Sequence, residues 1–218
     1  MINLNSKVDI FLLDLEKELK NSLPGMDAQK LMAPSFRIPG ISYFKRKNFK
    51  KSSVLILLYP VNEVLHTVFI LRALTGLHSG EISLPGGKAE SIDISPEHTA
   101  IRECNEEIGV KTEHIKIIGS LTGLYVHFSN YMIYPFVGYV NYKPSFVPNK
   151  NEVEEIIEVG FNELFAEKNR MSKKLKLAFF KIHAPYYDIR GQHIWGATAM
   201  IMSELNEIVK SLDTFNKL

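Results

Sequence analysis

The chain reads LPGGKAESIDISPEHTAIRECNEEIGV over residues 84–110, a glycine-containing turn followed by an acidic segment with helical spacing. Ser95 is a favourable N-cap, and Pro96 suits the first helical position because it has no N–H to leave unpaired. Gly109 can adopt the left-handed conformation that commonly ends a helix. These residues predict a helix over 96–108 that is entered through the glycine turn.

Three glutamates of this helix are predicted to share one flank. Glu103, Glu106 and Glu107 are related by i+3 and i+4 spacing, at which like charges repel by a few tenths of a kcal/mol. Arg102 can pair with Glu106, but one arginine cannot neutralise three carboxylates. Hard divalent cations take oxygen ligands, so the pattern predicts a site for Mg²⁺ or Mn²⁺.

The turn before the helix adds backbone groups to this site. Gly86 and Gly87 can both adopt positive φ and bring a carbonyl or an amide close to a ligand or metal. A metal site beside such a loop has the parts needed for phosphoryl chemistry, in which the metal neutralises phosphate charge and activates water. Glu103 or a nearby carboxylate could accept the proton of that water.

The composition excludes several classes of protein. A formal net charge of +2 over 218 residues argues against nucleic acid or a membrane as the main partner. Cys104, the lone cysteine, cannot form an internal disulfide, and its place in the apolar stripe of the helix indicates packing and not catalysis. The N-terminus lacks an uninterrupted apolar signal core, so we expect a cytoplasmic protein.

We expect a single domain over 1–218, with an N-terminal helix and extended lead-in over 1–52 and a core over 53–218. Apolar residues at helical spacing predict a helix over 7–22, and the core opens with a hairpin of strands 53–59 and 66–72. The remaining predicted strands are 114–120, 131–142, 154–160, 175–182 and 193–195, and the remaining helices are 161–167 and 197–212. Strands with few helices between them indicate an α+β fold with a mixed or antiparallel sheet.

Residues 87–110 resemble the Nudix box, G-x5-E-x7-R-E-U-x-E-E-x-G-U, where U is aliphatic. The matching positions are Gly87, Arg102, Glu103, Cys104, Glu106, Glu107, Gly109 and Val110. Asp93 stands where the pattern has Glu, and eight residues instead of seven separate it from Arg102, so Glu90 is a second candidate for the loop carboxylate that pairs with this arginine.

This resemblance implies an α/β/α sandwich with a mixed sheet and the catalytic loop and helix at 86–109. It implies a metal-dependent pyrophosphohydrolase that acts on a small nucleotide-diphosphate substrate. The carboxylates of Glu103, Glu106 and Glu107, with the Gly87 carbonyl, would bind Mg²⁺ or Mn²⁺, and Arg102 would orient the acids. Glu103, Arg102 and Glu107, with the more distant Glu152, form the predicted catalytic set.

The segment 78–87 resembles the H-x-G-Q-x-x-F-P-G-G stretch of one Nudix branch, the coenzyme A pyrophosphatases, as do the runs at 151–159 and 185–201. This branch would cleave coenzyme A to 4′-phosphopantetheine and adenosine 3′,5′-bisphosphate. The implied substrate-binding residues are Arg72, His78, Gly86 and Tyr187. The branch commonly has an arginine where this chain has Gly76, so ADP-ribose or a dinucleotide is an alternative substrate. A catalytically silent, nucleotide-sensing Nudix domain is an alternative of another class.

The sequence leaves the roles of several residues open. Glu152 or Glu155 could be the further acid that Nudix enzymes bring from a distant loop, or part of an ordinary charged turn. Tyr186, Tyr187 and Trp195 could form an aromatic wall for a ligand or fill the core. The N-terminal helix could cover the active site or form a homodimer interface.

Overall fold

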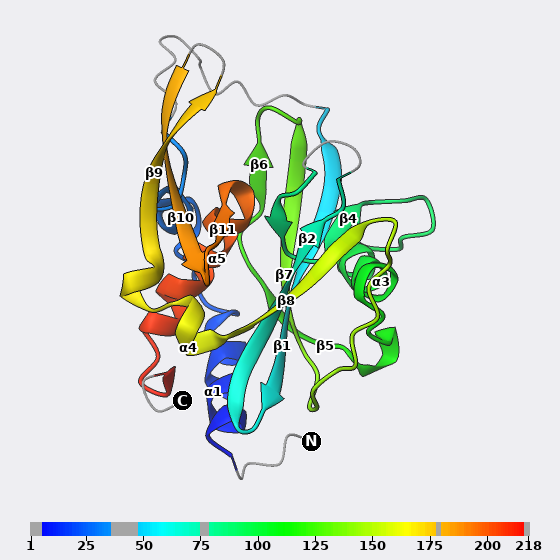
Figure 1. Cartoon of the computed structure of the whole chain (residues 1–218). Coiled ribbons are helices and arrows are strands. Elements are labelled where there is room, and N and C mark those ends of the chain that lie inside the picture. The colour runs from blue at the N-terminus through cyan, green and yellow to red at the C-terminus, as the bar shows by residue number, and fades with distance from the viewer. Residues whose placement is uncertain (1–5, 36–47, 75–78, 178–179, 216–218) are drawn as a thin grey trace.

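The computed structural model describes residues 6–35, 48–74, 79–177 and 180–215 (Figure 1). Its main sheet consists of β1 (Lys50–Val61), β2 (Val64–Arg72), β3 (Ile82–Ser83), β4 (Gly86–Lys88), β5 (Lys116–Ser120), β6 (Leu124–Val126), β7 (Tyr131–Tyr139) and β8 (Val153–Gly160). The strand order is β3-β2-β1-β7-β5, with β4 paired to β1, β6 to β7 and β8 to β2. Only β1 and β7 pair in parallel among these strands, so the sheet is mixed.

A second, antiparallel sheet follows in the order β11-β10-β9. Its strands are β9 (Arg170–Leu177), β10 (Phe180–Ile189) and β11 (Gln192–Trp195). The α-helices are α1 (Lys7–Glu18), α2 (Gly25–Lys30), α3 (Pro96–Ile108), α4 (Phe161–Leu164) and α5 (Gly196–Lys210). None of the helices in the described ranges is both long and apolar enough to cross a membrane.

Strand β1 lies at the centre of the molecule because both of its faces are apolar. Leu55, Leu57 and Tyr59 face α3, whereas Ile56 and Leu58 face the opposite side of the sheet, and all five are fully buried. Side chains alternate between the two faces of a strand, so an unbroken apolar run requires cover on both sides.

The two layers that cover the main sheet differ in composition. Figure 1 shows α3 on one side and α1, α5 and the three-stranded sheet on the other. The α/β/α arrangement and the mixed sheet expected from the sequence are therefore confirmed. The layer of α1 and α5 belongs to the larger apolar core, and α3 closes the smaller one.

The expected extended lead-in after Pro24 contains a short helix, α2. Gly25 begins it at φ +58°, a left-handed conformation that glycine adopts without strain. The helix is held by Gln29, whose amide donates to Glu204 Oε2 at 2.8 Å and to the Thr122 carbonyl at 2.9 Å. A buried hydrogen bond across 175 residues of sequence thus fixes a segment that local pattern alone reads as irregular.

The single strand expected over 175–182 is wrong. This region belongs to two antiparallel strands, because Leu177 pairs with Phe180 and the ladder continues to Arg170 opposite Tyr187. The N-terminal helix ends at Glu18 and not at residue 22, and α4 has only four residues. The other predicted elements lie where they were expected to within a few residues.

Candidate active site

Helix α3 has the bounds that its sequence predicts. The Ser95 hydroxyl accepts a hydrogen bond from the His98 N–H at 3.1 Å, and Gly109 closes the helix at φ +74°. The buried face includes Ala100 and Cys104, which pack against β1. Cys104 is fully buried and burial raises the pKa of its thiol, so its expected packing role is confirmed.

Glu107 is an almost fully buried carboxylate at the glycine turn. Its side chain is 1% exposed, and its Oε2 accepts the Gly86 N–H at 2.8 Å. Arg72 Nη1 lies 3.5 Å from its Oε1. Burial raises the pKa of the Glu107 carboxyl to about 8, although the Gly86 N–H and Arg72 favour the ionised form. The ionised side chain therefore needs more positive charge than these neighbours supply.

The Glu103 carboxylate lies against the same glycine turn, at Gly87. The approach is so close that a Cβ at this position would overlap the carboxylate. Burial raises the pKa of the Glu103 carboxyl, and the ion pair with Arg102 opposes that shift. Two buried carboxylates thus converge on the Gly86-Gly87 backbone, as the loop and helix pattern predicts.

Strand β4 fixes the turn in front of α3. Gly87 pairs with Ser53 and Gly86 with Val54 on β1, and Gly86 has φ +154°. A Cβ on Gly86 would overlap the backbone of both β1 residues. The close approach of the two strands therefore requires glycine, and it presents the Gly86 N–H to Glu107.

Arg102 ties the loop before α3 to the glutamates on it. Asp93 accepts from Arg102 Nε at 2.9 Å and from Nη2 at 3.0 Å, while Nη1 donates to Glu106 at 2.7 Å and lies 3.1 Å from Glu103. The hydrogen bonds from Arg102 hold the pKa of the Asp93 carboxyl well below its usual range. Asp93, and not Glu90, is the loop carboxylate that pairs with this arginine.

A family model described as the NUDIX domain matches residues 50–179, which include the whole loop, α3 and β8. The chain belongs to the Nudix family. The match covers more than half of the chain, and the arrangement of the box residues described above agrees with it. The resemblance seen in the sequence is thereby confirmed at the level of the family.

Three known proteins show what this Nudix chain is similar to. It is 30% identical over 207 residues to Nudix hydrolase 22, chloroplastic, of Arabidopsis thaliana, covering 91% of this chain and 65% of that protein. It is 31% identical to the mitochondrial coenzyme A diphosphatase NUDT8 of Homo sapiens, covering 69% and 65%. A MutT/nudix family protein from Enterococcus faecalis aligns over 78% of this chain and 66% of that structure, with a TM-score of 0.49 and 16% identity.

The matched regions cover 66%, 56% and 65% of the first three curated relatives. The Nudix chain therefore spans roughly three fifths of the length of these proteins.

The Nudix domain should lose stability when Asp93 is replaced by Asn. The change removes a charged acceptor from Arg102, and we expect unfolding to become easier by about 2 kcal/mol, the scale of a hydrogen bond to a charged group. Because the folded-state pKa of Asp93 is depressed, its contribution is complete above the unfolded pKa of about 4 and is lost as pH falls below it. Denaturant unfolding at pH 7 and below pH 4 should show the difference shrinking on acidification.

Glu90→Gln is the matched control for Asp93→Asn. Glu90 is exposed in the same loop, so the free energy of unfolding of the Glu90→Gln variant should stay within about 0.5 kcal/mol of the wild-type value. Equal losses in the two variants would contradict the assignment of Asp93.

Of the two candidate acids on the distant loop, Glu152 lies near the carboxylates. Its charge raises the pKa of both Glu103 and Glu107, and its backbone carbonyl accepts the Ala73 N–H at 2.9 Å. Glu155 instead accepts a hydrogen bond from Gln192 at 3.3 Å. Of the two acids, only Glu152 is therefore near enough to act on Glu103 and Glu107 electrostatically.

One predicted substrate contact lies in the core, and another falls outside the described residues. Tyr187 is 1% exposed and packs against Phe165 in the larger core, so it is a core residue and the prediction of a substrate contact is wrong. The alternation of β10 turns its side chain inward, and burial raises the pKa of its hydroxyl to about 12. His78 lies outside the described residues. Arg72 and Gly86 both contact Glu107.

The side chains of this Nudix site fit a hard divalent cation in their chemistry. Glu103 and Glu107, together with the half-exposed Glu106, offer carboxylate oxygens, and the Gly87 backbone lies against Glu103. Within the described residues, no three His, Cys, Asp or Glu side chains already enclose one point at metal-ligand spacing. Arg102 instead takes up oxygens of Glu103 and Glu106. Glu107 is the residue that best suits a bound cation, because added positive charge stabilises the ionised form of a buried carboxylate whose pKa is raised.

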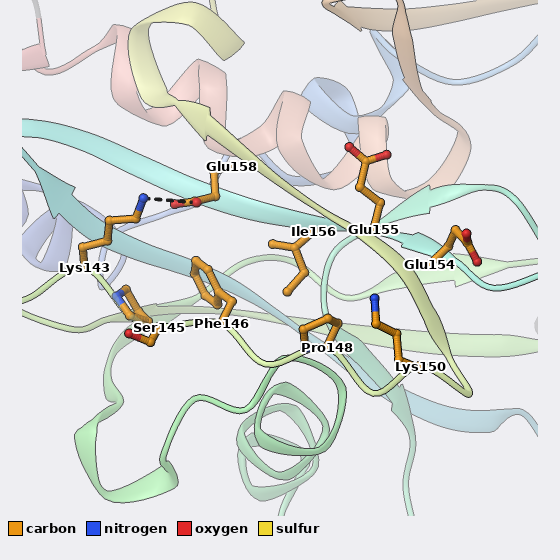
Figure 2. A pocket seen from close by; sticks show the side chains of 10 residues that line it. Lys143, Ser145, Phe146, Pro148, Lys150, Glu154, Glu155, Ile156 and Glu158 are labelled. Carbon is orange, nitrogen blue, oxygen red and sulfur yellow. Dashed lines mark ion pairs between the residues drawn. The ribbon is translucent and has the colours of Figure 1, made fainter.

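A surface groove of the described residues is lined by none of these carboxylates. It has a volume of about 610 Å³ and runs between the 143–150 loop and β8. Figure 2 shows Lys143 and Glu158 joined across it, at 3.2 Å, with Phe146 facing the same space. Glu158 also accepts a hydrogen bond from Tyr59 at 3.0 Å. These charges compensate one another, so the groove offers little to an anionic ligand.

Proposed function

We propose that this chain is a divalent-metal-dependent hydrolase that cleaves the phosphoanhydride bond of a nucleoside diphosphate derivative, with coenzyme A as its best substrate. The observation that carries the proposal is the convergence of Glu103 and Glu107 on the Gly86-Gly87 backbone. Burying two carboxylates together is unfavourable unless a cation compensates them. Nudix hydrolases generally depend on divalent metal ions, which supports the same reading.

The acidic residues of the site would bind the metal and accept a proton. Glu103, Glu106 and Glu107, with the Gly87 carbonyl, would hold Mg²⁺ or Mn²⁺, which would supply charge neutralisation of the diphosphate and a more acidic water molecule. Glu103 would accept the proton of the attacking water, since it lies at the turn beside Gly87.

The two arginines have separate roles in this proposal. Arg102 would keep Glu103 and Glu106 oriented through its bonds to Asp93. Arg72, which is one-third exposed and contacts Glu107, would bind a phosphate oxygen of the substrate. Glu152 would serve as a further acid beside the buried pair.

The preference for coenzyme A rests on similarity. The relative NUDT8 is named as a coenzyme A diphosphatase, and the 78–87 segment and the runs at 151–159 and 185–201 resemble the coenzyme A branch. These observations support coenzyme A over ADP-ribose or a dinucleotide.

A substrate panel tests the proposal. Coenzyme A, ADP-ribose, NADH and a dinucleoside polyphosphate are each incubated with the protein and Mg²⁺ or Mn²⁺, and the products are separated and identified. We expect coenzyme A to give 4′-phosphopantetheine and adenosine 3′,5′-bisphosphate with the highest kcat/KM, and we expect chelation of the metal to stop the reaction. A higher kcat/KM for another compound of the panel would make that compound the proposed substrate. Hydrolysis of none by a folded protein would contradict the proposal and favour a nucleotide-sensing domain.

A further inference from the structure

A second groove lies where the edge of the main sheet meets the three-stranded sheet. It has a volume of about 330 Å³. Leu71, Glu81 and Ile82 line it on the side of β2 and β3, and Lys173, His193 and Trp195 line it on the side of β9 and β11. The groove therefore combines apolar and aromatic side chains with the basic Lys173 on one side and the acidic Glu81 on the other, from elements far apart in the chain.

Lys173 brings an unneutralised positive charge to this groove. Its Nζ lies 2.8 Å from His193 Nδ1 and 5.0 Å from the centroid of the Tyr186 ring. An ammonium group only donates, so Nδ1 of His193 accepts and the imidazole carries its proton on Nε2, which faces Asp188 at 3.7 Å. Within the described residues, no carboxylate makes an ion pair with Lys173.

The aromatic side chains lie on the same face of the small sheet as this charge. Trp195 pairs directly with Tyr186 across β10 and β11, and the rings of Tyr186 and His193 are 4.4 Å apart between centroids. Trp195 is half-buried, so part of its surface is open to the groove. A ring surface beside an ammonium group suits a nucleobase with a nearby phosphate, because the base can stack and the phosphate accepts charge-assisted hydrogen bonds.

The groove is connected to the carboxylate site through Arg72. The Arg72 N–H donates to the Glu81 carbonyl at 3.1 Å, and the Gly80 N–H donates to the Arg72 carbonyl at 3.0 Å. The guanidinium of the same residue lies 3.5 Å from Glu107. The backbone of β2 opposite β8 also has a register irregularity at Leu71 and Arg72, and such irregularities redirect side chains near active sites.

We propose that this groove binds the nucleoside half of the substrate, with the base against Trp195 and Lys173 on a phosphomonoester that is not part of the cleaved diphosphate. This inference rests on the proposed function and deepens it. It makes Lys173 a specificity-determining residue that selects coenzyme A over dephospho-coenzyme A, which lacks the ribose phosphate.

Kinetics on this pair of substrates test the role of Lys173. We expect Lys173→Gln to lower kcat/KM for coenzyme A by about 10- to 100-fold, the equivalent of one charge-assisted hydrogen bond, and to leave dephospho-coenzyme A almost unchanged. Lys174→Gln is the matched control, since Lys174 is the exposed neighbour on the opposite face of β9 and should affect neither substrate. An equal loss for both substrates, or no loss for coenzyme A, would overturn the inference.

Tryptophan fluorescence provides a readout that needs no turnover. Trp195 is the single tryptophan of the chain, so all tryptophan emission comes from a residue that lines this groove. Without metal, adenosine 3′,5′-bisphosphate should change the emission at lower concentration than AMP, and Lys173→Gln should remove that difference. Coenzyme A hydrolysis without any emission change would overturn the groove and keep the proposed function. A selective emission change in a protein that hydrolyses nothing would keep the groove and overturn the function.

Discussion

Replacing Glu107 by Gln should lower the turnover of coenzyme A by at least about 100-fold and leave the fold intact. Loss of groups that only support metal ligands already costs about 10- to 100-fold, so loss of a proposed ligand should cost no less. Glutamine retains an oxygen acceptor for the Gly86 N–H and removes a carboxyl group whose ionised form is disfavoured by burial. Stability should therefore stay at or above the wild-type value when both proteins are measured without metal.

Steady-state kinetics with Mg²⁺ and thermal unfolding in chelator check the two parts of this prediction. Glu106→Gln should also lower turnover, since Glu106 belongs to the proposed metal set. Glu97→Gln is the matched control, because Glu97 is exposed in the first turn of the same helix. Wild-type turnover in Glu107→Gln would remove Glu107 from the mechanism, and a large loss of stability would assign it to folding.

Replacing Gly87 by Ala should lower turnover by about 100-fold, the cost of displacing a catalytic group by about 1 Å. The new methyl group would overlap the Glu103 carboxylate, which must then move away from the turn. The φ of Gly87 lies outside the left-handed region, so alanine adds no backbone strain there. The loss should therefore appear in kcat more than in the free energy of unfolding.

Gly160→Ala provides the comparison for Gly87→Ala. A Cβ at Gly160 would make only ordinary contact with His66, at 3.7 Å, and the residue lies at the start of α4. Both variants should fold, and only Gly87→Ala should lose activity. Full activity in Gly87→Ala would mean that Glu103 tolerates displacement and is not the proton acceptor.

Helix α3 could be predicted from sequence because its boundaries depend on local chemistry. The cap at Ser95, the proline that follows and the stop at Gly109 are each decided by a few neighbouring atoms. The central strand could be predicted for a similar reason, since an unbroken apolar run needs cover on both faces.

Other features depend on contacts between segments that are distant in sequence, and the local sequence pattern cannot predict such contacts. The choice of Asp93 over Glu90 depends on how the loop folds back to Arg102. Alternation in β10 shows that Tyr186 and Tyr187 face opposite sides, but only packing shows that Tyr187 faces the core. The contact between Lys173 and His193 brings together β9 and β11, the two outer strands of the three-stranded sheet, and the sequence pattern does not show that these strands flank β10.

The buried position of Cys104 makes its rate of chemical labelling a measure of local opening around α3. An alkylating reagent can reach this sole thiol only when α3 leaves the sheet, so the labelling rate measures how often this helix detaches. Any ligand that bridges the helix and the glycine turn should slow that labelling.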